Sequence, residues 1–144
     1  MHETVAIIPA HNEEAVIGEA IDSLPAQTHR TEIVVACDNC TDGTVNVAFA
    51  SFPRNYVGSF FVMETVNNEA FKSGALNQAL RLLPNDVNYV LILDADTWAA
   101  PELVAEAVAL LENNPDPGAV CARTHVMPQE KLGLFETIWL RLQR

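Results

Sequence analysis

Short apolar runs rich in β-branched residues alternate along this chain with segments whose apolar residues recur at helical spacing. The runs predict strands near residues 4–9, 32–37, 59–64, 89–94 and 119–124. The segments between them predict helices that begin after residue 12, with Asn12 as the helix cap, and near residues 45, 71 and 101. Because such alternation builds βαβ units, neighbouring strands are expected to run parallel. The sequence therefore predicts an α/β fold with a mostly parallel sheet and helices on both faces.

Two aspartates, Asp94 and Asp96, follow the fourth predicted strand. The continuous apolar run 90–93 before them is typical of a central strand that is buried on both faces. Side chains at positions i and i+2 of an extended chain point to the same side, so the two carboxylates are expected to converge. In open α/β sheets, ligands bind at the carboxyl ends of the strands. A pair of ionised carboxylates there favours a divalent cation, and oxygen ligands suit Mg²⁺ or Mn²⁺.

Polar residues also follow the other predicted strands. They are His11, Asn12 and Glu13 after the first strand, Asp38 and Asn39 after the second, and Asn67, Asn68 and Glu69 near the third. Each cluster alone is typical of an ordinary turn, because Asn and Asp hydrogen-bond to nearby backbone. In a parallel sheet, however, all four strand ends meet at one edge. Four clusters at one edge, including an acidic pair, favour a ligand site.

Composition and charge limit the class of partner. A chain of 144 residues is long enough for one domain with a core, and its net charge of −11 argues against nucleic-acid binding. An acidic protein can still bind an anionic ligand when a divalent metal neutralises the local charge. No apolar run approaches the ~18 residues of a membrane span. Three cysteines and a start without a basic segment predict a cytoplasmic protein.

Four motifs, taken together, resemble those of the inverting family 2 glycosyltransferases. In chain order they are residues 5–14 (VAIIPAHNEE), 38–44 (DNCTDGT), 72–77 (KSGALN) and 94–96 (DAD, an Asp-x-Asp motif). Each motif is weak alone, but the ordered set, over roughly residues 4–125, is specific. The resemblance implies a GT-A, Rossmann-like fold that binds a nucleotide-diphosphate sugar, with a UDP-sugar favoured, and Mn²⁺ or Mg²⁺ as cofactor.

The resemblance also implies roles for individual residues. Asp38 would accept a hydrogen bond from the base, and Lys72 would approach the phosphates. Asp96 would bind the metal, with Asp94 as a second candidate ligand that contacts the ribose or sugar. The metal would stabilise the departing nucleotide diphosphate. The residues implied in nucleotide and donor binding, of which the first three would wall the base, are Pro9, Ala10, His11, Glu13, Asp38, Asn39, Lys72, Asn77 and Asp94.

The resemblance does not supply a catalytic base. Members of this family continue well beyond this length, and nothing after Arg123 matches the acceptor-side carboxylate of their second half. Inverting transfer needs a group that deprotonates the acceptor hydroxyl. Two hypotheses therefore remain open. Either the chain is a glycosyltransferase domain, apparently truncated, or it is a nucleotide or nucleotide-sugar binding module without turnover.

The domain division is predicted at residue 128. Residues 1–128 would form the GT-A-like domain, and residues 129–144 an amphipathic helix with an apolar stripe at Leu132, Phe135, Ile138 and Trp139. This stripe is predicted to contact a second copy of the chain, a membrane surface or the sheet. Association of the protein with a membrane surface is therefore one of the expectations.

Two other interpretations use the same residues. In a haloacid-dehalogenase-like phosphatase, Asp94 would be the nucleophile and Asp96 an acid/base, but such enzymes need a later lysine, and Lys131 is the sole lysine after the motif. The spacing of Cys37 and Cys40 fits a redox or zinc site, for which Cys121 is the nearest further candidate together with His125. For the cysteines, we favour two small buried residues on either side of Asp38.

Overall fold

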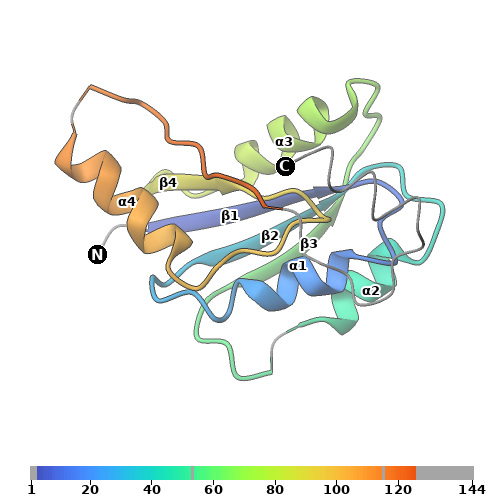
Figure 1. Cartoon of the computed structure of the whole chain (residues 1–144). Helices are drawn as coiled ribbons and strands as arrows, with labels where there is room; N and C mark the ends of the chain where they lie inside the picture. Colours follow the sequence, from blue (N-terminus) through green and yellow to red (C-terminus); the bar gives the residue numbers. More distant parts are fainter. Residues whose placement is uncertain (1–2, 53, 115, 126–144) are drawn as a thin grey trace, which may run out of the picture.

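Four strands form one parallel sheet in the computed structural model, which describes residues 3–52, 54–114 and 116–125 (Figure 1). The strands are β1 (Glu3–Ala10), β2 (Glu32–Cys37), β3 (Phe60–Glu64) and β4 (Val87–Ile92), in the order β3-β2-β1-β4. The helices between and after them are α1 (Ile17–Ser23), α2 (Thr44–Ala50), α3 (Phe71–Leu82) and α4 (Leu103–Asn113). Every strand pair is parallel, which confirms the predicted α/β class.

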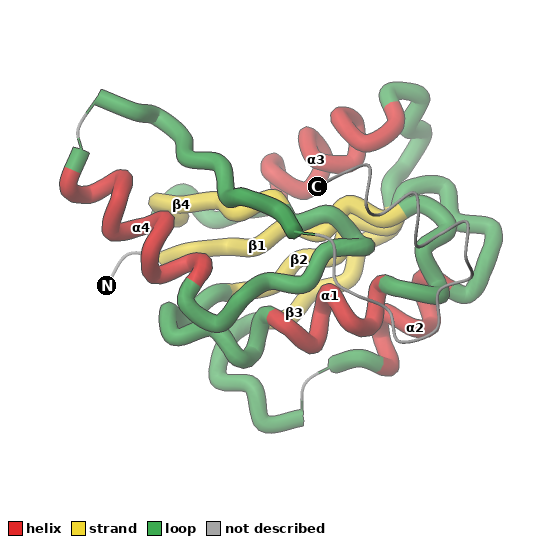
Figure 2. The backbone as a smooth tube through the Cα atoms, in the orientation of Figure 1, coloured by secondary structure: helices red, strands yellow, loops and turns green. Residues whose placement is uncertain are grey.

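Helices cover both faces of the sheet, as the sequence predicts. Successive residues of β1 point to opposite faces, so Ile8 packs in the core with α1, whereas Ile7 packs in the core with α3. Figure 2 shows α1 and α2 on one side of the strands and α3 on the other. The start of α4 is tied to the loop after α1 by Gln27, whose Nε2 donates to the carbonyl of Ala100 at 2.7 Å.

The strand β4 differs from the prediction in two ways. It lies at an edge of the described sheet and not at its centre, because β1 and β2 occupy the middle. It is also exposed on one face and only partly buried on the other, since Val90 and Ile92 are 41% and 51% exposed and the residues that alternate with them are intermediate. The reason is that α3 packs mainly on β1 and β2. Leu93, on the other face, is buried, and its N–H continues the ladder to the carbonyl of Ile7.

The fifth predicted strand is wrong. Residues 119–124 are described, but they form no strand and are exposed. Apolar β-branched residues supply a tendency toward extended structure, whereas a strand also needs a neighbour's backbone groups as partners. The predicted helix at 129–144 lies outside the described residues. None of the helices in the described part of the chain combines the length and apolar composition needed to cross a bilayer.

Candidate functional site

The carboxyl ends of the four strands bring the predicted polar clusters to one edge of the sheet (Figure 1). His11 follows β1, Asp38 follows β2, Thr65 follows β3 and Asp94 comes shortly after β4. Because all strands are parallel, these four positions lie at the same edge. The prediction that Asp38 and Asp94 share an edge is confirmed.

Asp38 is the centre of a hydrogen-bonded cluster at this edge. Its side chain is buried, at 5% exposure, and Oδ1 accepts hydrogen bonds from Thr65 Oγ1 at 2.7 Å and Asn68 Nδ2 at 2.7 Å. Asn39 Nδ2 adds a third bond to Oδ1 at 3.1 Å. A buried carboxylate is costly unless donors surround it, and these three come from two parts of the chain, the residue after Asp38 and the segment after β3. The cluster therefore fixes the carboxylate and the loops that carry its donors.

The backbone of Asp38 joins the same edge to the end of β1. Its N–H donates to the carbonyl of Ala10 at 2.7 Å, and its own carbonyl lies 2.6 Å from His11 Nδ1. Since a carbonyl only accepts, His11 must carry its proton on Nδ1 in this contact. The other ring nitrogen, Nε2, lies 3.4 Å from the amide nitrogen of Asn12. The ring of His11 is thus fixed beside Asp38.

The loop after β1 interlocks with the loop after β2, and this corrects the prediction for Asn12. The side chain of Asn12 accepts a hydrogen bond from the N–H of Thr41 at 2.8 Å and does not cap a helix. Its φ of 57° is left-handed, a conformation that Asn tolerates well. The N–H of Glu13 donates to Thr44 Oγ1 at 2.7 Å. Because residues 12 and 13 are engaged in this way, α1 begins only at Ile17.

The two cysteines beside Asp38 are free, and their environment favours a packing role. Burial raises the pKa of the Cys37 thiol to about 12, so this residue is not a thiolate at neutral pH. Cys40 is partly buried, and its Sγ lies 3.5 Å from the carbonyl of Ala10. The described residues contain no group of three or more His, Cys, Asp or Glu side chains that could hold a metal ion. The described residues therefore show no zinc site at Cys37 and Cys40.

The acidic pair carries exposed side chains beyond β4. Asp94 and Asp96 are exposed, while Ala95 between them is buried at 4%, so both carboxylates face away from the core. A turn closed by the bond from the N–H of Thr97 to the carbonyl of Asp94 at 3.0 Å holds the segment. The ammonium of Lys72, from the first turn of α3, forms an ion pair with Asp94 Oδ1. This contact brings two of the predicted motifs together.

The donor set at this edge fits a divalent cation that is shared with a phosphate. Mg²⁺ and Mn²⁺ bind through one or two carboxylates together with substrate phosphate oxygens and water, and need no protein cage. Asp96 offers a carboxylate whose only described side-chain bond is the weak one from Thr97 Oγ1 at 3.4 Å. Asp94 offers a second carboxylate that Lys72 partly neutralises. The residues present therefore fit such an ion without forming a closed site.

The other predicted residues are distributed around this edge. Pro9 and Ala10 are buried at the end of β1, whereas His11 and Asn39 are exposed. Asn77 is exposed and lies further along α3 than Lys72.

Two partners of Asp38 carry no predicted role. Thr65 is not predicted from the sequence as a site residue, and Asn68 is predicted only as part of a polar cluster. The signal for both was the polar sequence directly after the third strand.

The fold and site agree with comparisons to known proteins. The model for Glycosyl transferase family 2 matches residues 5–137. A Bacillus subtilis protein described as a probable glycosyltransferase, YdaM, is 30% identical over 87% of this chain, which covers 30% of that protein. The beta-monoglucosyldiacylglycerol synthase of Nostoc sp. is 29% identical over 81% of this chain, and the match covers 25% of the synthase.

Solved structures give the same result. The mannosyltransferase PcManGT from Pyrobaculum calidifontis, in complex with GDP-Man and Mn²⁺, superposes with a TM-score of 0.66 and 31% identity over 76% of this chain and 32% of its own. Staphylococcus aureus TarS in complex with UDP gives a TM-score of 0.65 and 26% identity over 77% of this chain and 32% of its own.

The parallel sheet with its polar strand-end edge is therefore the GT-A fold of glycosyltransferases. The chain belongs to glycosyl transferase family 2. It spans less than a third of the length of the two relatives above. Membership of this family does not support the phosphatase interpretation of Asp94 and Asp96.

Proposed function

We propose that this chain is the donor-binding part of an inverting glycosyltransferase, which holds a nucleotide-diphosphate sugar with Mn²⁺ or Mg²⁺. The observation that carries the proposal is the pairing of two different sites at one edge. A buried, fully oriented carboxylate, Asp38, suits a neutral base, and an exposed group of Lys72, Asp94 and Asp96 suits charged phosphates. The complexes of related proteins with UDP and with GDP-Man and Mn²⁺ support the same ligand class.

Asp38 would recognise the base. The three hydrogen bonds from protein side chains all reach Oδ1, which leaves Oδ2 as the acceptor for a base N–H. An ionised carboxylate only accepts, so it selects a base edge that presents a donor. His11 stands next to it as an exposed ring whose Nδ1 contacts the Asp38 carbonyl, and Pro9 and Ala10 precede it at the end of β1.

The phosphate end would involve Lys72, Asp94 and Asp96. A bound divalent ion would supply Lewis-acid stabilisation of the charge that develops on the departing diphosphate. Asp96 would hold this ion, with Asp94 as a second ligand or as a contact to the ribose or sugar. The Lys72 ammonium would add a second positive charge near the phosphates. The group that deprotonates the acceptor is not assigned to a residue of this chain.

A nucleotide panel with a turnover arm tests the proposal. UDP, GDP, ADP and CDP are titrated into the 144-residue chain with Mn²⁺, and the sugar nucleotides of any diphosphate that binds are then assayed for donor hydrolysis. Binding of at least one diphosphate with hydrolysis of its sugar nucleotide supports the transferase. Binding without hydrolysis supports the module without turnover. Binding of none of the four contradicts the proposed site.

A further inference from the structure

We infer that Asn68 is a positioning residue of the proposed donor site. It ties the carboxylate of Asp38, at the base end, to the first turn of α3, which carries Lys72 at the phosphate end. The inference rests on the proposed function, and it adds a physical link between the two halves of the site. Neither the family motifs nor the comparisons assign a role to this residue.

Both the nitrogen and the oxygen of the Asn68 side-chain amide form hydrogen bonds. Its Nδ2 donates to Asp38 Oδ1 at 2.7 Å and to the carbonyl of Phe71 at 2.8 Å. Its Oδ1 accepts from the N–H of Ala70 at 3.0 Å. An amide has two donors on nitrogen and an acceptor on oxygen, so only Asn or Gln can make this set of contacts. The short Asn side chain thus joins a buried carboxylate to the backbone that enters α3.

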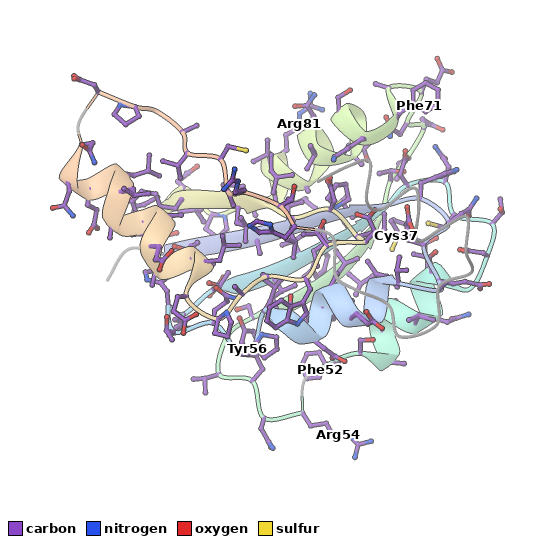
Figure 3. All side chains as sticks on the ribbon, in the orientation of Figure 1. Cys37, Phe52, Arg54, Tyr56, Phe71 and Arg81 are labelled. Carbon is purple, nitrogen blue, oxygen red and sulfur yellow. The ribbon has the colours of Figure 1, made fainter. Side chains whose placement is uncertain are left out.

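The backbone that Asn68 holds is strained. Phe71 has a φ of 51°, a left-handed conformation that is unfavourable for a residue with a side chain. Its ring is 82% exposed, so burial of the side chain does not offset this cost (Figure 3). The hydrogen bond from Asn68 to the Phe71 carbonyl is one of the contacts that hold this conformation in place. Strain of this kind persists where surrounding contacts fix it, and it is common at ligand sites.

Lys72 follows Phe71 directly, and the ion pair of Lys72 with Asp94 depends on how α3 begins. The contacts therefore run without a break from Asp38 through Asn68 to Phe71, and from Lys72 to Asp94. Removing Asn68 should release the α3 turn as well as one donor to Asp38.

A glycine makes room for this side chain. At Gly74, which is buried in α3, an added Cβ would lie 1.8 Å from Asn68 Oδ1 and 2.7 Å from its Cγ. A side chain at position 74 would therefore push Asn68 out of its place. Gly74→Ala is a second way to break the link without touching Asp38 or Lys72.

Asn39 offers a matched control. Its Nδ2 also donates to Asp38 Oδ1, at 3.1 Å, but its other hydrogen bond goes to the carbonyl of Asn68 and not to α3. Asn39→Asp and Asn68→Asp thus place the same new charge against the same carboxylate. Only the second variant also breaks the contact to the α3 turn.

The test is the ratio of diphosphate to nucleoside affinity. UDP and uridine, or GDP and guanosine where the parent prefers guanine, are titrated in Mn²⁺ into the parent and the three variants. Because the diphosphate end depends on α3, Asn68→Asp and Gly74→Ala should each lower this ratio by about fivefold or more. Asn39→Asp should weaken both ligands together and leave the ratio within about twofold of the parent.

A pH series separates positioning from simple capping. In Asn68→Asp, two carboxyl groups share one site, which raises the pKa of one of them. When the introduced carboxyl group is protonated, it can donate to Asp38, so affinity relative to the parent should recover near pH 5.5 and fall toward pH 8. Dividing by the parent at each pH removes the contributions of His11, Glu69, Lys72 and the phosphates. Aspartate is as good a helix cap as asparagine, so a residue that only caps α3 would show no change.

The outcomes are distinct. Parent-like ratios and a flat relative pH profile for Asn68→Asp overturn the inference. If circular dichroism shows that Asn68→Asp is unfolded, Gly74→Ala decides, and a folded Gly74→Ala with the parent's ratio also overturns it. A parent that binds neither UDP nor GDP in Mn²⁺ contradicts the proposed function instead.

Discussion

Lys72 and Asp94, 22 residues apart in the chain, form an ion pair at the strand-end edge of the sheet. The pair joins the first turn of α3, which covers one face of β1 and β2, to the segment after β4. Both side chains are about half exposed, at 54% and 55%, so solvent screens the attraction. We therefore regard the pair as part of the candidate site and not as a main contributor to folding.

Lys72→Met tests this view of the ion pair. Without metal, the ammonium is the main positive charge facing the phosphates, so the variant should bind UDP about tenfold more weakly in chelator. In saturating Mn²⁺, the loss should be less than about threefold, because the metal supplies the charge. The free energy of unfolding should change by less than about 1 kcal/mol. Calorimetric titration and urea unfolding give the two quantities.

Arg81→Met is the matched control for Lys72→Met. Arg81 is an exposed basic residue in the last turn of the same helix (Figure 3). It should leave UDP affinity unchanged in both conditions. An equal loss for Lys72→Met with and without metal would argue against a phosphate role for the lysine.

Thr65→Val should show the importance of the donors around Asp38. The substitution keeps the shape of the side chain but removes one hydrogen bond, at 2.7 Å, to a carboxylate that is 5% exposed. A buried acceptor that loses a donor costs roughly 1–3 kcal/mol, so the free energy of unfolding should fall by that amount. Thr97→Val, which removes only a 3.4 Å contact to exposed Asp96, should cost less than about 0.5 kcal/mol. Urea unfolding of both variants compares them, and equal losses would contradict the buried cluster.

Cys37 is expected to resist alkylation in the native protein. Burial raises the pKa of its thiol to about 12, and the reactive species is the thiolate. At pH 8, iodoacetamide should therefore modify exposed Cys121 but not Cys37, as read by peptide mass spectrometry. After denaturation, both should react. Rapid native labelling of Cys37 would contradict the packing role.

The raised pKa of the Cys37 thiol also predicts how the free energy of unfolding changes at alkaline pH. The folded state keeps the Cys37 proton between the ordinary thiol pKa of 9.0 and about 12, while the unfolded chain releases it. Protons bound by the folded state alone mean that stability falls as the pH rises through this range. Cys37→Ala removes this group, so its unfolding free energy should decline less between pH 9 and 11 than that of the parent. Parallel declines in the two proteins would argue against the raised pKa.

The sequence predicts that the site lies at the carboxyl ends of the strands, but it does not predict the order of the strands. The alternation of strands and helices predicts parallel pairing, and that alone places Asp38 and Asp94 at one edge. It does not give the order of the strands, so β4 was expected at the centre. Its apolar run predicts burial on both faces, but Val90 and Ile92 are exposed because α3 covers other strands.

The errors in the site come from contacts between distant segments. Asn12 fits a local helix cap, but its side chain bonds to Thr41, on a different loop. Thr65 and Asn68 gain their roles only when the ends of β2 and β3 meet at Asp38. Local pattern identifies residues that are suited to hydrogen bonding, whereas the tertiary fold decides which partner each one finds.

The most direct measurement is the affinity for UDP in chelator and in Mn²⁺, for the parent and for Asp96→Asn. If UDP binds the parent through a metal, affinity should rise at least about tenfold with Mn²⁺, and Asp96→Asn should lose most of that rise while remaining folded. Asp86→Asn is the control, since this exposed residue precedes β4 and lies at the opposite edge of the sheet. It should behave as the parent does. A parent with equal affinity in chelator and in Mn²⁺, or an Asp96→Asn variant indistinguishable from the parent, would contradict a metal-dependent donor site at this edge.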